Sequence, residues 1–209
     1  MKNLIICCEG KTEELFIEKI LTPYLADFGL YVTQKGMKGV SDYKQIKTFI
    51  IGYCKSNPTA LVTTMIDYYG AARSLPGFNA EMGDIYTRTK TIEEAVQNDL
   101  QLQNLIFNLT LHEFEGYLFS NTSAFADIAS KSQLDELTNI RNRHDTPEHI
   151  NDKYETAPSR RILKVLPKYQ KLQNGILIAE NITVDGISAE CYHFANWIDK
   201  LTAWAKEGA

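Results

Sequence analysis

The chain has 209 residues, of which 44% are hydrophobic and 23% are charged, and it carries a formal net charge of −4. This balance is typical of one globular domain of ordinary size with room for a smaller appendage, and no apolar run approaches the ~20 residues of a membrane helix. The four cysteines lack the spacing of a disulfide framework or a zinc site, which favours reduced thiols in a cytoplasmic protein.

The first part of the chain alternates strand-like and helix-like segments. Residues 3–8 form a continuous apolar run, typical of a strand covered on both faces, and Glu9-Gly10 ends it. Thr12 can cap the helix that follows, whose apolar residues recur at three-to-four spacing as far as Phe28. Further elements are expected as strands over residues 30–34, 60–66 and 104–111, and as helices beginning at Ser41 or Asp42 and spanning about 91–102.

From about residue 120 the pattern changes to helices and polar turns, with a loop expected over residues 145–158 and an amphipathic helix over 197–204. The earlier rhythm of strand and helix favours an α/β fold with a mainly parallel sheet flanked by helices. We therefore expect an α/β domain over residues 1–120 and a helical C-terminal extension, residues 121–209, packed on it.

Acidic residues follow three of the expected strands, after Cys8, Ile66 and Leu111. In parallel sheets ligands bind beyond the carboxyl ends of the strands, so these acids are expected to lie close together. Carboxylate oxygens with no cysteine nearby suit Mg²⁺ or Mn²⁺ better than zinc. The sequence therefore predicts a divalent-metal site, and its candidate ligands are Glu9, Glu13, Asp67 and Glu115.

Each of these acids also has a plainer interpretation. Glu13 could complement the dipole of the helix that it begins, and Asp67 could cap a turn. Glu113 and Glu115 alternate, so only one of them is expected to reach a shared site. Glu9 is harder to explain in this way, because an unpaired carboxylate beside a buried strand is costly.

Two familiar motifs are excluded. Gly10-Lys-Thr12 is not a phosphate-binding loop, because the glycine required five residues earlier is Ile5. His112-Glu113 does not begin a zinc-protease motif, because the second histidine would have to stand at Gly116. Phosphoryl transfer is the chemistry most often built on a carboxylate-bound divalent metal.

Taken in order, the motifs resemble a Toprim domain of the kind found in the OLD nucleases over about residues 1–120. Over nearly the whole chain, to Cys191–Trp197, they resemble an uncharacterised bacterial Toprim-like family. The segments that carry this resemblance are Glu9-Gly-Lys-Thr-Glu-Glu14, Met65-Ile-Asp-Tyr-Tyr-Gly70, Leu111-His-Glu-Phe-Glu-Gly-Tyr-Leu-Phe119 and Thr156-Ala-Pro-Ser-Arg-Arg-Ile162.

The resemblance implies a Mg²⁺-dependent nuclease that hydrolyses DNA or RNA, acting as the effector of a phage-defence system with an ABC- or AAA-type ATPase partner. It implies that Glu9 is a metal ligand and the general acid/base, and that Asp67, Glu13 and Glu115 are further ligands. Toprim domains usually carry Asp-x-Asp, whereas Tyr69 stands in place of the second aspartate here. The number of metals is therefore open, and a non-catalytic binding or regulatory subunit is the alternative.

Basic residues near these motifs are candidates for binding a phosphate substrate. Arg160 and Arg161 follow a proline turn and could bind phosphate bidentately, or could pair with the acidic surface instead. Lys11 and Arg73 are candidates of the same kind. An acidic chain that holds nucleic acid needs such a local basic patch, a metal or another protein. The sequence leaves open the choice of DNA or RNA and whether the chain forms a homodimer.

Overall fold

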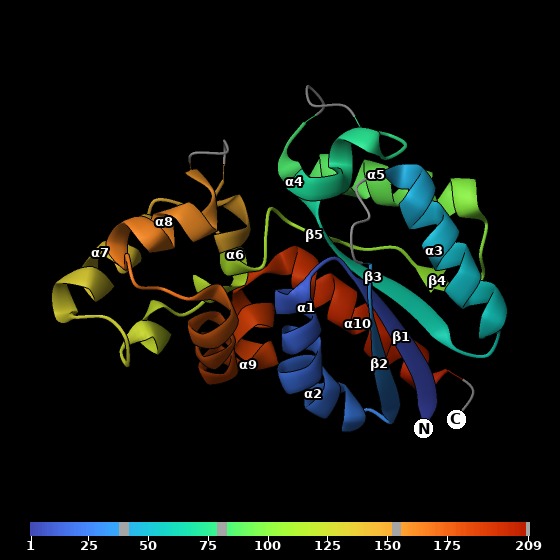
Figure 1. Ribbon diagram of the computed structural model, residues 1–209, viewed down its shortest axis with the longest axis horizontal. Helices are drawn as coiled ribbons and strands as arrows, with labels where there is room; N and C mark the ends of the chain where they lie inside the picture. Colours follow the sequence, from blue (N-terminus) through green and yellow to red (C-terminus); the bar gives the residue numbers. More distant parts are fainter. Residues whose placement is uncertain (38–41, 79–82, 152–155, 208–209) are drawn as a thin grey trace.

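The computed structural model describes residues 1–37, 42–78, 83–151 and 156–207 (Figure 1). A parallel sheet of five strands has the order β2-β1-β3-β4, and β5 pairs with β3 farther along the same edge. The strands are β1 (Lys2–Cys8), β2 (Leu30–Gly36), β3 (Leu61–Asp67), β4 (Leu105–Ile106) and β5 (Leu109–Thr110). The predicted α/β fold, a parallel sheet flanked by helices, is confirmed.

Helices cover both faces of the sheet, as the alternation of buried side chains in β1 requires. Ile5 and Cys7 belong to the core on the side of α3 (Tyr43–Ser56) and α5 (Ile85–Leu100). Leu4 and Ile6 pack on the opposite side. The elements on that side are α1 (Lys11–Phe16), the π-helical turn η1 (Ile17–Leu21), α2 (Thr22–Ala26), α9 (Ile176–Glu190) and α10 (Tyr192–Lys206).

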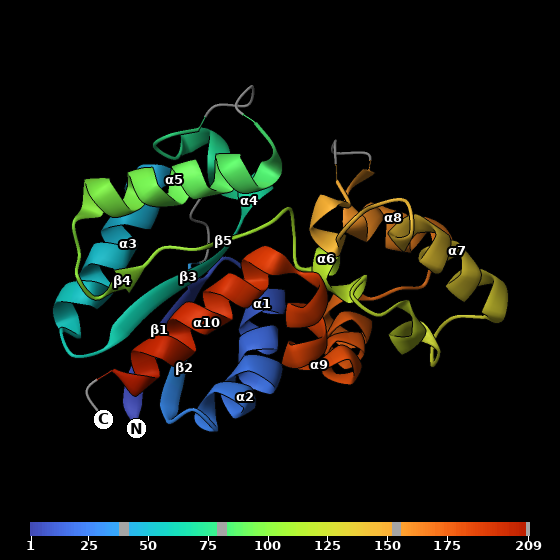
Figure 2. The same ribbon diagram turned by 180° about the vertical axis from the view of Figure 1, so that it is seen from behind.

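The last helix belongs to the sheet, although it lies in the extension. Figure 2 shows α10 lying over the sheet, and its fully buried Trp197 donates its indole N–H to Thr63 Oγ1 at 2.9 Å. At the far end of the helix, Lys2 Nζ donates to the carbonyl oxygen of Trp204. Packing of the extension on the sheet is thus direct, while a domain boundary at residue 120 remains a prediction.

Most of the remaining elements belong to an arm to one side of the sheet or to the turns that lead to it (Figure 1). The arm contains α7 (Lys131–Arg141) and α8 (Pro158–Val165). The shorter elements are α4 (Tyr68–Ala71), η2 (Ala72–Ser74), α6 (Glu115–Leu118), η3 (Thr122–Phe125), η4 (Pro147–His149) and η6 (Lys171–Gly175). In the part of the chain that the structure describes, no helix has the length and apolar character of a membrane span.

The fourth strand differs from the prediction, because it is interrupted at Phe107 and Asn108. Side chains replace the strand ladder there. Phe107 N–H donates to the side chain of Gln97 at 3.2 Å, and Asn108 N–H donates to Thr64 Oγ1 at 2.8 Å. The pattern of apolar residues predicts one unbroken strand, because it carries no information on hydrogen bonds between side chains and main-chain N–H groups.

One of the following two helix boundaries differs from the prediction, and the other agrees with it. The helix expected from about residue 91 begins at Ile85, because Asp84 caps it by accepting from Thr87 N–H at 2.8 Å. Asp42 likewise caps α3 by accepting from Gln45 N–H at 2.9 Å, whereas the alternative start at Ser41 lies outside the described residues. All four cysteines are buried free thiols.

Candidate functional site

Glu9 and Asp67 lie together because β1 and β3 are adjacent parallel strands that end at the same edge of the sheet. Glu9 Oε2 accepts from the backbone N–H of Asp67 at 3.4 Å. Within the described part of the chain, Asp67 Oδ1 is buried and receives no hydrogen bond. An anionic oxygen in that position would be stabilised by a nearby cation, because no protein donor in the described residues compensates its charge.

Glu13 joins this pair from the first turn of α1, where it is 4% exposed. The turn before the helix is built around its carboxylate. A Cβ atom at Gly10 would lie 2.9 Å from Glu13 Oε2, closer than real Cβ contacts come. A larger residue at position 10 would therefore require the Glu13 carboxylate to shift.

The three carboxylates form what we call the carboxylate cluster: Glu9, Glu13 and Asp67. Burial raises the pKa of Asp67 well above its ordinary value, with further contributions from the negative charges of Glu13, Glu9 and Glu113 and opposition from Lys171. Burial also raises the pKa of Glu9, although the Asp67 N–H opposes the shift. Ionisation of the buried carboxylates is thus unfavourable in free energy, and a bound cation would stabilise their charged forms.

Lys171, in η6, supplies a positive charge here that the sequence did not indicate. Its Nζ lies 3.0 Å from Oε2 of Glu115, a side chain that is 1% exposed. Burial lowers the pKa of Lys171, but the charges of Glu115, Asp67 and Glu13 outweigh that effect and leave it raised. Burial raises the pKa of Glu115 to about 6. Lys171 therefore connects the first residue of α6 to the carboxylate cluster.

The neighbouring Glu113 is used differently. Its Oε1 accepts from the backbone N–H of Ser159 at 2.6 Å, in the first turn of α8. The side chain thus satisfies one of the main-chain donors that a helix start leaves without an internal partner. Glu113 holds the arm against the strand ends, while Glu115 faces Lys171.

Tyr69, which stands where a second acid was sought, lies on the other side of Asp67. It is 48% exposed and stacks on the imidazole of His112, with ring centroids 5.2 Å apart and an angle of 21° between the planes. His112 is buried and has a φ of +66°, a left-handed conformation that is uncommon outside glycine. The stack thus joins the start of α4, which follows β3, to the segment that follows β5.

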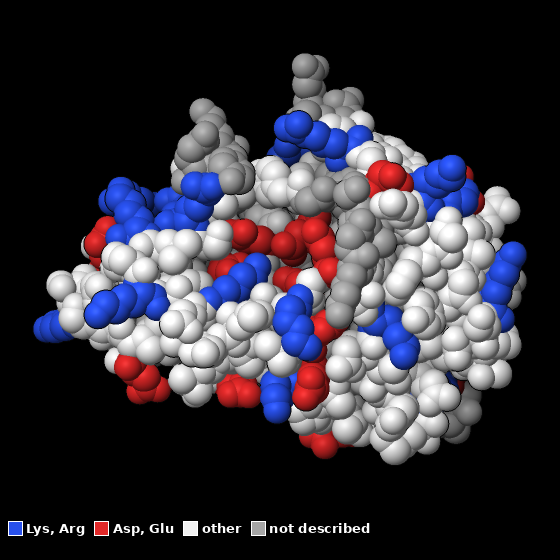
Figure 3. All heavy atoms as spheres, in the orientation of Figure 1, with Lys and Arg blue, Asp and Glu red and all other residues white. Residues whose placement is uncertain are grey.

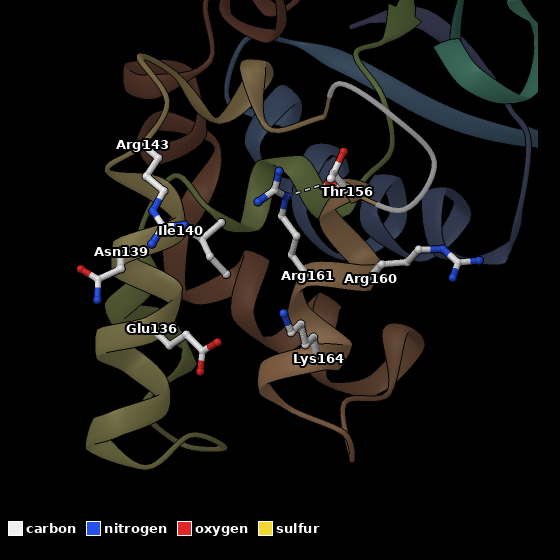
Figure 4. A pocket seen from close by; sticks show the side chains of 8 residues that line it. All are labelled: Glu136, Asn139, Ile140, Arg143, Thr156, Arg160, Arg161 and Lys164. Atoms are coloured by element: carbon white, nitrogen blue, oxygen red, sulfur yellow. Dashed lines mark hydrogen bonds between the residues drawn. The ribbon is translucent and has the colours of Figure 1, made fainter.

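The predicted basic residues separate into two groups. Lys11 is exposed and pairs with Glu14 at 3.0 Å, and Arg73 is exposed in η2. Arg160 and Arg161 lie on α8 instead, where both line a cavity between α7 and α8 (Figure 4). The structure therefore does not gather the four into one substrate site.

The metal itself remains a prediction. Among the residues that the structure describes, no group of three or more His, Cys, Asp or Glu side chains has metal-ligating geometry. The donor chemistry of the cluster nevertheless fits a hard cation, because its side chains offer carboxylate oxygens alone and one Asp67 oxygen lacks a hydrogen bond.

Comparisons with known proteins place these observations in a family. A family model described as "Domain of unknown function (DUF4276)" matches residues 8–202. No curated protein matches the chain.

Two solved structures are similar to this one. The C-terminal region of the Burkholderia pseudomallei OLD protein has 18% sequence identity and a TM-score of 0.45, over 97% of this chain and 98% of that one. The C-terminal region of the Xanthomonas campestris pv. campestris OLD protein has 15% identity and a TM-score of 0.41, over 94% and 96%. Identities this low transfer no activity to the chain.

Proposed function

The chain belongs to the family described as Domain of unknown function (DUF4276), and we propose that it is a Toprim-like, Mg²⁺-dependent nuclease that cleaves phosphodiester bonds in DNA or RNA. One observation carries the proposal: at the ends of β1 and β3, Glu9 and Asp67 lie together with raised pKa values, and Asp67 Oδ1 lacks a hydrogen bond. Such a pair is stabilised by a divalent cation and is suited to chemistry on phosphate.

The chain's own residues divide the work as follows. Glu9, Glu13, Asp67 and Glu115 would hold Mg²⁺ or Mn²⁺, which supplies a polarised phosphate and a more acidic water when bound. Glu9, at the end of β1 beside the proposed metal, would also transfer the proton of the attacking water or of the leaving group. Lys171 adds a positive charge beside Glu115, where it would stabilise the negative charge that develops on the phosphate.

A second candidate function is a non-catalytic binding or regulatory subunit. The stack of Tyr69 on His112 favours it, because this arrangement puts aromatic surface where a second acid would serve a two-metal mechanism. For either function we propose an ABC- or AAA-type ATPase partner and a cytoplasmic role in phage defence. The net charge of −4 supports a recruiting partner, since an acidic chain gains little from counterion release.

A cleavage assay with Asp67→Asn tests the proposal. DNA and RNA are incubated with Mg²⁺ or Mn²⁺, with and without the ATPase partner, and the rates of wild type and variant are compared. Loss of one charge that stabilises the transition state costs about 10²–10³ in rate. The control is Asp127→Asn, which removes an exposed carboxylate and should leave the rate unchanged.

Metal binding provides a second measurement on the same variants. Mn²⁺ titrated calorimetrically into the wild type and Asp127→Asn should give a binding isotherm that Asp67→Asn weakens or loses. Equal cleavage by wild type and Asp67→Asn would locate the activity elsewhere. Absence of both metal binding and cleavage in the wild type would favour the regulatory subunit.

A further inference from the structure

A cavity of about 280 Å³ lies between α7 and α8, away from the carboxylate cluster. Its basic side chains are Arg143, Arg160, Arg161 and Lys164, which we call the basic surface. A single acid, Glu136, faces them. A protein of net charge −4 thus concentrates four cations around one small cavity.

Part of the basic surface is held in place by the backbone. Arg161 Nε donates to the carbonyl oxygen of Thr156 at 2.7 Å, which fixes the position of its guanidinium group (Figure 4). Figure 4 also shows Arg160 extending along the opposite side of α8 from α7. Cations therefore project from both sides of this helix, and α8 need not rearrange to contact a ligand that passes over it.

The basic surface is connected to the carboxylate cluster through the first turn of α8. Ser159, beside Arg160, donates its N–H to Glu113, whose charge in turn reaches Asp67. In Figure 3, Lys and Arg gather over the arm, and Asp and Glu line a hollow beside it. The bond from Ser159 to Glu113 thus places the start of α8 next to the segment that follows β5.

A second cavity extends the same surface in the other direction. Arg143 also lines a cavity of about 350 Å³ together with Arg88 and His112. His112 stacks on Tyr69, two residues after Asp67. The two cavities share Arg143, although the second is also lined by Asp84 and Asp145.

We propose that the basic surface binds backbone phosphates of a polynucleotide strand beyond the phosphate that is cleaved, so that the substrate is a strand and not a mononucleotide. This inference rests on the proposed function. Guanidinium groups bind phosphate bidentately, and several cations along a path match the repeated charge of a backbone. A mononucleotide at the cluster would leave the cations of the arm without a role.

The test measures binding without cleavage. A fluorescently labelled single strand is titrated with protein in EDTA at several salt concentrations, and anisotropy gives the dissociation constant. The double variant Arg143→Gln/Lys164→Gln removes two exposed cations of the basic surface. The control Lys44→Gln/Lys55→Gln makes the same charge change at exposed positions of α3.

The variant of the basic surface should bind roughly tenfold more weakly, and its salt slope should fall by about 1.4, since each phosphate contact on a single strand contributes about 0.7. The control should match the wild type, and a mononucleotide should not displace the strand. Equal affinities of the two double variants overturn the inference, and so does a wild type that binds no strand at low salt. Loss of ATPase-partner binding with unchanged strand affinity also overturns it, assigning the surface to a protein.

The outcome is separable from that of the proposed function. Asp67→Asn, which keeps the basic surface intact, should bind the strand as tightly as the wild type while failing to cleave it. If the wild type binds in this manner but never cleaves, the nuclease proposal fails and the strand-binding surface stands. If the wild type cleaves and the two double variants bind alike, the nuclease proposal stands and the surface fails.

Discussion

The carboxylate cluster and the basic surface carry opposite charge, and the fold builds them in opposite ways. Glu9 and Asp67 stand at the ends of adjacent strands, where the sheet fixes their positions and removes much of their contact with water. Arg143 and Lys164 project from or beside helices of the arm and remain exposed. A buried charge depends on its neighbours, whereas a solvated one is nearly self-sufficient, so only the cluster should respond strongly to loss of a partner.

The C-terminal extension, which carries the basic surface, also supplies a cation beside the carboxylate cluster. Lys171 comes from the part of the chain that follows α8, yet it pairs with Glu115 beside the cluster. Trp197, farther on, covers the sheet that carries the cluster's strands. The extension therefore carries the basic surface and also contacts the sheet. Substitutions at its contacts with the sheet test how far the carboxylate cluster depends on it.

The largest expected effect is that of Trp197→Ala. Removal of a fully buried indole should lower the free energy of unfolding by about 3–5 kcal/mol, because a cavity opens between α10 and the sheet. Chemical denaturation would measure the loss. Trp197→Phe keeps a six-membered ring but loses the rest of the indole and the bond to Thr63, so its cost should be smaller than that of Trp197→Ala. A loss no greater than that from Tyr192→Ala, at an exposed position of the same helix, would mean that the sheet does not depend on the extension.

Lys171→Met should have the next largest effect, and it concerns Glu115 and the adjoining carboxylate cluster. Breaking a fully buried ion pair costs about 3–5 kcal/mol, and we expect about 2–3 kcal/mol here because Lys171 is 38% exposed. Thermal or chemical unfolding at neutral pH measures it, and Lys168→Met, at an exposed position, is the control. The deficit should shrink in acid, where Glu115 takes up a proton. An unchanged stability would show that the cluster does not need this cation.

Part of the fold and part of the candidate site could be predicted from the sequence. Residues 3–8 and 60–66 were expected as strands because their apolar runs are local signals, and they match β1 and β3 within a residue or two. The approach of Glu9 to Asp67 follows from parallel strands ending at one edge, a rule that needs only the order of the elements.

The same reasoning could not find Lys171 or the shape of the arm. Lys171 lies in a polar segment without a strand end or a motif, and only tertiary packing brings its ammonium group to Glu115. Arg160 and Arg161 were singled out as a pair, but Arg143 joins them only because α7 and α8 lie side by side. The interruption of the fourth strand depended on side chains of α5 and Thr64 that no local pattern reveals.

The smallest expected effect is a change in how stability depends on pH. The folded protein raises the pKa of Glu115 from 4.5 to about 6, chiefly by burial. Between these two pH values the folded state holds a proton that the unfolded state has released. The contribution of Glu115 to stability is therefore fully present below about pH 4.5 and falls as pH rises to 6.

Glu115→Gln removes this titration and sharpens the contrast between buried and solvated charge. Unfolding is measured in EDTA from pH 4 to pH 7.5, and the wild type should lose about 2 kcal/mol relative to the variant across the window, since one pKa unit corresponds to about 1.4 kcal/mol. Glu180→Gln, at an exposed position, should leave the wild-type profile unchanged. Glu9 and Asp67 have raised pKa values as well, so both proteins keep a residual slope, and the difference between them isolates Glu115. If the two glutamine variants gave identical profiles, burial of Glu115 beside Lys171 would carry no energetic cost, and the contrast between the two regions would lose its basis.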